Sequence, residues 1–133
     1  MRPLTIFLSR LIGLFSLVFA LAMILHRDSF AAVTSAMIHD PPLVFLLGLI
    51  ALAIGLAMVL SHNIWSGGAL PVVITLIGWL QLIRGITALL VPPEALASFF
   101  DKMNFGKFSY GPFVITLALG LYLTYMGFRP SRP

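Results

Sequence analysis

Four long apolar runs constrain the fold of this chain more than any other feature of its sequence. They occupy residues 4–25, 43–60, 69–91 and 112–128, and each contains at most one charged side chain. A helix of about 20 apolar residues crosses the hydrocarbon core of a bilayer, so each run is long enough, or nearly so, for one span. We predict an all-α membrane protein with four transmembrane helices in a single domain over residues 1–133.

The overall composition supports a lipid environment. Hydrophobic residues make up 60% of the chain and charged residues 9%, whereas soluble domains have about 45–50% apolar and about 25% charged residues. The net charge is +4, but the basic residues are scattered, and no basic patch of the kind that binds nucleic acid is present. The chain contains no cysteine, which excludes disulfides, thiol redox chemistry and metal centres with cysteine ligands.

The connections on one side of the predicted bundle have amphipathic patterns. Within residues 26–42, Phe30, Val33 and Met37 recur at helical spacing before a proline pair, and residues 94–105 repeat the pattern with a stronger apolar stripe. We predict two short interfacial helices, with a plain loop as the alternative for the first. The order of span, interfacial helix, proline and span occurs twice, which raises a two-fold structural repeat as a hypothesis.

The first apolar run has a second interpretation. Ala20, Leu21 and Ala22 resemble the small-residue cleavage site of a secretory signal peptide. The run 4–25 is nevertheless long enough to span a bilayer, and we predict a retained transmembrane helix.

The distribution of charge predicts the orientation. Arginines lie near both termini, whereas the basic residues of the opposite connections are balanced by acidic ones. Because cytoplasmic segments of membrane proteins are enriched in Lys and Arg, we predict that both termini and the turn at residues 62–68 are cytoplasmic. The two interfacial helices then lie on the outer side.

Arg84 is the one charged side chain of its apolar run and lies well inside it. It lies about 10 Å from the outer end of its predicted helix at 1.5 Å per residue, and a charge at such depth costs about 2.5 kcal/mol or more. Gln81 shares its helix face. We interpret the pair as an anchor for an anion or lipid headgroup, with a snorkelling arginine as the alternative. Three carboxylates on the outer side are candidate ion-pair partners: Asp28, Asp40 and Glu94.

Three polar or aromatic residues distinguish the predicted inner turn, namely His62, Asn63 and Trp65. Asn63 suits a helix end or the turn itself, and Trp65 suits the aromatic belt at the membrane interface. These roles explain the residues without a ligand, although a docking turn for a partner protein is a second interpretation.

The sequence predicts no metal, no cofactor and no catalytic group. His26 and His39 flank the first outer connection together with two aspartates, but their spacing matches no known ligand pattern. His62 is predicted to lie on the opposite side of the membrane. Nucleophile elbows, phosphate-binding loops and carboxylates within the spans are also absent from the sequence.

The strings SHNIW at residues 61–65 and TLIGWLQLIRG at residues 75–85, with a proline soon after, resemble a family of small bacterial four-helix inner-membrane proteins. A looser similarity exists to the DoxX-like four-helix proteins. The first resemblance implies a bacterial inner membrane and implies no catalytic role.

We therefore predict a non-enzymatic accessory or assembly subunit that contacts the lipid bilayer and either another membrane protein or a second copy of itself. Small residues such as Gly13 and Gly55 allow close helix approach, within the bundle or in an oligomer. A small transporter or lipid-binding protein that uses Arg84 and the outer interfacial helices is the alternative. A membrane enzyme or redox protein would need a cofactor near the outer histidines. Candidate contact residues are Arg84, Gln81, His62, Asn63 and Trp65.

Overall fold

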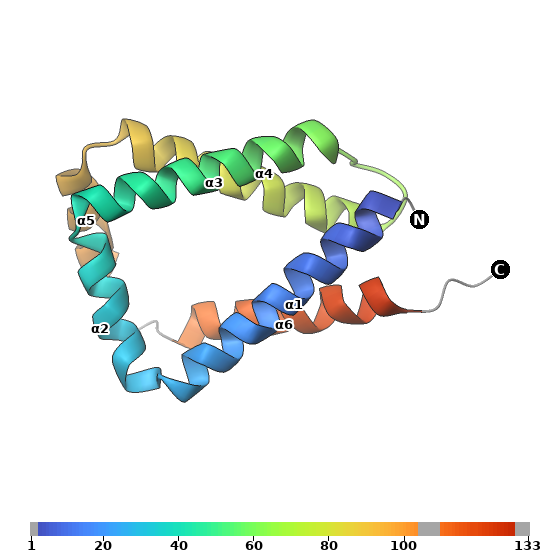
Figure 1. Ribbon diagram of the computed structural model, residues 1–133, viewed down its shortest axis with the longest axis horizontal. Coiled ribbons are helices and arrows are strands. Elements are labelled where there is room, and N and C mark those ends of the chain that lie inside the picture. The colour runs from blue at the N-terminus through green and yellow to red at the C-terminus, as the bar shows by residue number, and fades with distance from the viewer. Residues whose placement is uncertain (1–2, 104–109, 130–133) are drawn as a thin grey trace.

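The chain is all-helical throughout the part that the structure, a computed structural model, describes, which is residues 3–103 and 110–129. The all-α prediction is confirmed for these residues. They form six helices that follow one another with short connections (Figure 1): α1 (Pro3–Leu25), α2 (Arg27–Ile38), α3 (Pro41–Ser61), α4 (Ala69–Leu90), α5 (Pro93–Met103) and α6 (Tyr110–Phe128).

Three helices are long and apolar enough to cross a membrane, and they indicate a membrane protein. Helices α1, α3 and α4 contain 23, 21 and 22 residues, which matches the length of about 20 that the hydrocarbon core requires. Their ends lie within two residues of the predicted spans. The described apolar stretch of α6, Phe113–Phe128, is shorter.

Both amphipathic connections are helical, as α2 and α5. The proline pair after α2 does more than end it, because Pro41 and Pro42 form the first turn of α3. Proline suits this position, since amide hydrogens in the first turn have no partner within the helix. Asp40 caps α3 by accepting a hydrogen bond from the amide of Leu43 at 3.4 Å.

The long helices form two close pairs, α3 with α4 and α1 with α6. A Cβ atom at Gly13 of α1 would stand 2.6 Å from the backbone nitrogen of Thr124 in α6, and one at Gly55 of α3 would overlap the backbone of Leu82 in α4. Only glycine permits such approach. These small residues therefore pack helices of the same chain against one another.

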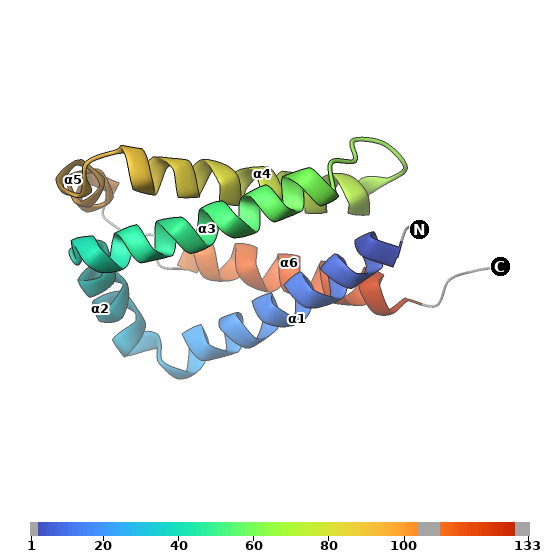
Figure 2. The ribbon, with the colours of Figure 1, turned by 45° about the horizontal axis from the view of Figure 1, so that its top comes forward.

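The two pairs meet at one end only, which we call the closed end. Their shared core consists of residues in the helix halves near the turn at residues 62–68: Leu8, Met58, Leu70, Ile74 and Leu123. Away from this core the pairs diverge, and α2 and α5 lie at the opposite end (Figures 1 and 2). The N-terminal end of α1 and the C-terminal end of α6 lie at the closed end.

Candidate functional site

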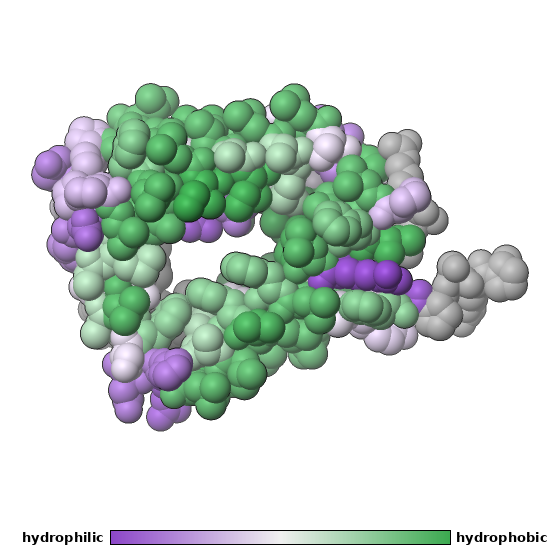
Figure 3. Space-filling view, viewed as in Figure 1, coloured by the Kyte–Doolittle hydropathy of each residue, from purple (hydrophilic) through white to green (hydrophobic). Residues whose placement is uncertain are grey.

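The divergence of the two helix pairs leaves an opening, here called the window. It lies between α3–α4 and α1–α6, with α2 at the end away from the core, and the space-filling view shows background through it (Figure 3). Most of its visible edge is hydrophobic, but hydrophilic atoms lie along the α3–α4 side. The window is therefore an apolar passage with a polar group on one wall.

Helix periodicity identifies the polar residues on that wall. Leu70 and Ile77 of α4 pack at the core shared by the two pairs, and Arg84 follows Ile77 by seven residues, which is within about 20° of the same direction. Gln81 follows the buried Ile74 by the same spacing. The face of α4 that packs at the closed end thus continues, two turns further on, as Gln81 and Arg84 facing the window.

Arg84 carries a charge that no carboxylate neutralises in the described structure. Its Nη1 donates one hydrogen bond, of 3.5 Å, to Oε1 of Gln81, and the side chain is otherwise exposed. None of the three predicted partner carboxylates forms a salt bridge with it across residues 3–103 and 110–129. The guanidinium remains available to an external anion.

An aromatic cluster occupies the opposite wall. Phe15 of α1 follows Leu8 of the shared core by seven positions, and Phe19 follows Ile12, which packs against that core, by the same spacing. Their rings stack at 6.3 Å, and Phe19 meets Phe30 of α2 edge to face at 5.9 Å. Phe15 is 70% exposed. This cluster, here called the aromatic shelf, offers the window a broad apolar surface.

The closed end is held by a buried histidine. His62 is 1% exposed. Its Nε2 lies 2.9 Å from the hydroxyl of Thr5 in α1, and its Nδ1 lies 3.2 Å from the hydroxyl of Thr75 in α4. One side chain thus joins the start of α1, the end of α3 and the first half of α4.

The surroundings of Thr75 determine the tautomer of this histidine. The Thr75 hydroxyl lies 2.9 Å from the carbonyl oxygens of both Pro71 and Ile64, so its single hydrogen is donated to a carbonyl. Its lone pairs then accept from the amide of Ile64 at 3.0 Å and from the His62 ring. We infer that Nδ1 carries the ring hydrogen and that Nε2 accepts from Thr5.

Asn63 and Trp65 lie on the exposed side of the turn. Oδ1 of Asn63 accepts from the indole N–H of Trp65 at 2.7 Å and from that of Trp79 at 3.4 Å. The turn itself ends in Gly67 and Gly68, whose φ angles of 92° and 120° favour glycine. These contacts stiffen the turn against α4.

The five predicted contact residues therefore do not form one site. Gln81 and Arg84 face the window, His62 is buried at the closed end, and Asn63 and Trp65 lie on the surface of the turn. Sequence reasoning missed Thr5, Thr75 and the aromatic shelf. The seven-residue spacing from Leu8 to Phe15 is a signal that could have identified the shelf.

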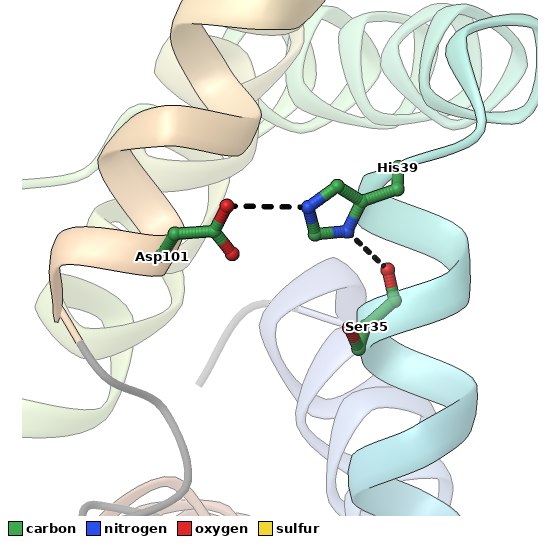
Figure 4. Close-up of polar contacts among 3 residues, drawn as sticks. All are labelled: Ser35, His39 and Asp101. Atoms are coloured by element: carbon green, nitrogen blue, oxygen red, sulfur yellow. Dashed lines mark hydrogen bonds and ion pairs between the residues drawn. The ribbon is translucent and has the colours of Figure 1, made fainter.

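At the far end of the molecule, His39 links α2 to α5 (Figure 4). Its Nδ1 lies 2.8 Å from the carbonyl oxygen of Ser35, and its Nε2 lies 3.3 Å from Oδ2 of Asp101. The bond to Ser35, and secondarily the one to Asp101, raises the pKa of His39 above its usual value of 6.5. Over the described ranges, no three His, Asp or Glu side chains are placed to hold a metal ion.

Comparisons with known proteins assign neither a family nor a function to this chain. No protein-family model, no curated protein and no solved structure matches the chain. The resemblance to small bacterial four-helix proteins stays a prediction, and function is inferred from the window and the closed end.

Proposed function

We propose that this chain is a four-span membrane protein that binds a lipid-like amphiphile in the window and catalyses no reaction. Helix α6 is the fourth span. It lies along α1, where Gly120 approaches Leu17 and Gly127 approaches Arg10. Its 19 residues extend about 28 Å at 1.5 Å per residue, close to the hydrocarbon thickness of about 30 Å.

The arrangement of the pairs supports the two-fold repeat. If α1, α2 and α3 correspond to α4, α5 and α6, then the pair α1–α6 corresponds to the pair α4–α3. Both pairs are closely packed through glycine, and each amphipathic helix follows the first helix of its unit. A parallel repeat of two three-helix units, in which the last helix of each unit packs against the first helix of the other, would produce these two pairs.

The charges support an inner-membrane protein with both termini in the cytoplasm. Arg10 and Arg129 lie toward the closed end, whereas at the other end Arg27 of α2 and Lys102 of α5 are accompanied by Asp28, Glu94 and Asp101. By the positive-inside rule, this modest bias supports a cytoplasmic closed end. The family resemblance supports a bacterial inner membrane.

The size of the window favours a lipid over a partner helix. From Ile12, the last residue of α1 packed at the core, to Leu25 at its end, the window extends about 20 Å at 1.5 Å per residue. A transmembrane helix needs about 30 Å, whereas one leaflet of hydrocarbon is about 15 Å deep. The length of the window therefore suits a lipid chain that enters from the side better than a helix that spans the membrane.

A second function, that of an accessory or assembly subunit, is favoured by the surface of the turn. Trp65 is 54% exposed, Leu60 near the end of α3 is 82% exposed, and the hydrogen bond to Asn63 fixes the Trp65 ring. This surface suits another membrane protein or a second copy of the chain at the cytoplasmic interface.

Native mass spectrometry after gentle-detergent purification tests the proposed function. We expect the wild type to retain one bound lipid and the double variant Phe15→Ala/Phe19→Ala to lose it. Phe7→Ala is the matched control, because Phe7 is 58% exposed on α1 but lies at the closed end. Wild type without lipid in every preparation would overturn the proposal, and a stoichiometric second protein would support the accessory function instead.

A further inference from the structure

The window carries features that define the chemistry of its occupant more closely. We propose that the window selects a phospholipid whose headgroup has a net negative charge, with its phosphate bound by Arg84 and Gln81 and an acyl chain lying on the aromatic shelf. This inference rests on the proposed function, because it names the class of amphiphile that the window takes.

Gln81 and Arg84 present mainly hydrogen-bond donors to the window. Oε1 of Gln81 already accepts from Nη1 of Arg84. Apart from the second lone pair of that oxygen, these two side chains offer the amide NH₂ of Gln81 and the other N–H groups of the guanidinium, all of which are donors. Such a cluster is complementary to an acceptor-rich anion, and guanidinium binds phosphate through paired hydrogen bonds.

The charge balance of the described structure favours a net anionic headgroup over a zwitterionic one. Arg84 has no carboxylate partner, because the single salt bridge between described residues joins His39 to Asp101. A zwitterionic lipid would place its ammonium close to the guanidinium of Arg84, and like charges repel. An anionic phospholipid neutralises the arginine and leaves no charge of its own unpaired.

The opposite wall fits hydrocarbon and not a second polar group. Phe15, Phe19 and Phe30 form the shelf through ring contacts at 6.3 Å and 5.9 Å. The window passes through the molecule (Figure 3), so one acyl chain can lie against the shelf while the other stays in the bilayer. Lateral diffusion within the membrane is then sufficient for entry.

Competition between two lipids tests the inference. The full chain is delipidated, mixed in detergent with equimolar phosphatidylglycerol and phosphatidylcholine, and analysed by native mass spectrometry. We expect roughly tenfold preference for phosphatidylglycerol, equivalent to about 1.4 kcal/mol, because phosphatidylcholine brings an ammonium group close to the Arg84 guanidinium and phosphatidylglycerol does not. Arg84→Gln should abolish the preference, and Arg129→Gln, which changes an exposed arginine at the closed end, should keep it.

A second variant distinguishes loss of the lipid preference from loss of folding. Gln81→Glu places a carboxylate where Gln81 now bonds to Arg84, so it neutralises the guanidinium from within. We expect it to remain folded and to lose the preference for phosphatidylglycerol. An unchanged preference in both Gln81→Glu and Arg84→Gln would overturn the inference.

The remaining outcomes separate the inference from the proposed function. Equal binding of both phospholipids by the wild type, lost in Phe15→Ala/Phe19→Ala, would overturn the headgroup assignment and leave lipid binding intact. Displacement of phosphatidylglycerol by equimolar oleate would show that the site prefers a fatty-acid carboxylate, which also overturns it. Failure of the wild type to bind any of the three would overturn lipid binding itself.

Discussion

His62 is buried to 1% exposure and bonded at both ring nitrogens, so its side chain joins α1 to α4 at the closed end. Its partner Thr5 lies 57 positions away in the chain. The sequence shows His62 as a distinctive turn residue, but a single hydroxyl among apolar neighbours gives no sign of which distant group it will meet. For the same reason Asn63 was recognisable as a turn residue, whereas its bond to Trp79 was not.

Substitution of His62 should weaken the closed end. In His62→Phe, the ring volume is roughly kept but both side-chain hydrogen bonds are lost, and buried Thr5 is left without this partner. We expect a loss of about 1–3 kcal/mol in the free energy of unfolding, measured by denaturant titration in micelles.

The double variant Thr5→Val/His62→Phe provides the control. It removes both partners of the Thr5 bond, so its destabilisation should be smaller than the sum of the two single variants. Strict additivity would show that Thr5 and His62 do not interact.

Helices and their ends were the most predictable level of this structure. The three long spans follow from local apolar composition, and their observed ends differ from the predicted ones by two residues or fewer. The proline pair at Pro41 and Pro42 was predicted as the end of one helix and also proves to be the first turn of the next. A proline pair marks a helix boundary but does not show whether the helix precedes or follows it. Here Asp40 caps the helix that follows, α3.

The contact between α2 and α5 should depend on pH. Because the pKa of His39 is raised above 6.5 in the folded chain, the link to Asp101 is fully present below pH 6.5 and weakens as pH rises through the raised pKa. The chain has no cysteine, so spin labels at Ala36→Cys and Ser98→Cys report on these two helices alone.

We expect a narrow label-to-label distance distribution below pH 6.5 that broadens at higher pH. The Asp101→Asn variant should show the broad distribution throughout, since it removes the negative partner. A distribution in the original labelled protein that is the same at every pH would contradict this role of His39.

At the scale of the whole molecule, the divergence of the helix pairs was not predictable from the sequence. Hydropathy identifies which segments prefer lipid but does not distinguish a residue facing lipid from one facing the window, because both are apolar. Arg84 was recognisable as unusual from its position. That it faces a window, opposite an aromatic shelf, depends on where the shared core ends, and this is set by the close glycine contacts within each pair.

The proposed topology can be mapped with single cysteines in intact cells, using a maleimide that does not cross the membrane. Ser35→Cys in α2 and Ser98→Cys in α5 are exposed positions and should react from outside. Ser66→Cys, exposed in the turn, should react only after permeabilisation. A tag after residue 133 should be accessible only after permeabilisation as well, because an even number of spans returns the chain to the cytoplasm. If α6 does not cross the membrane, the tag becomes accessible in intact cells while the three cysteines keep their pattern, so the experiment isolates the fourth span from the other three.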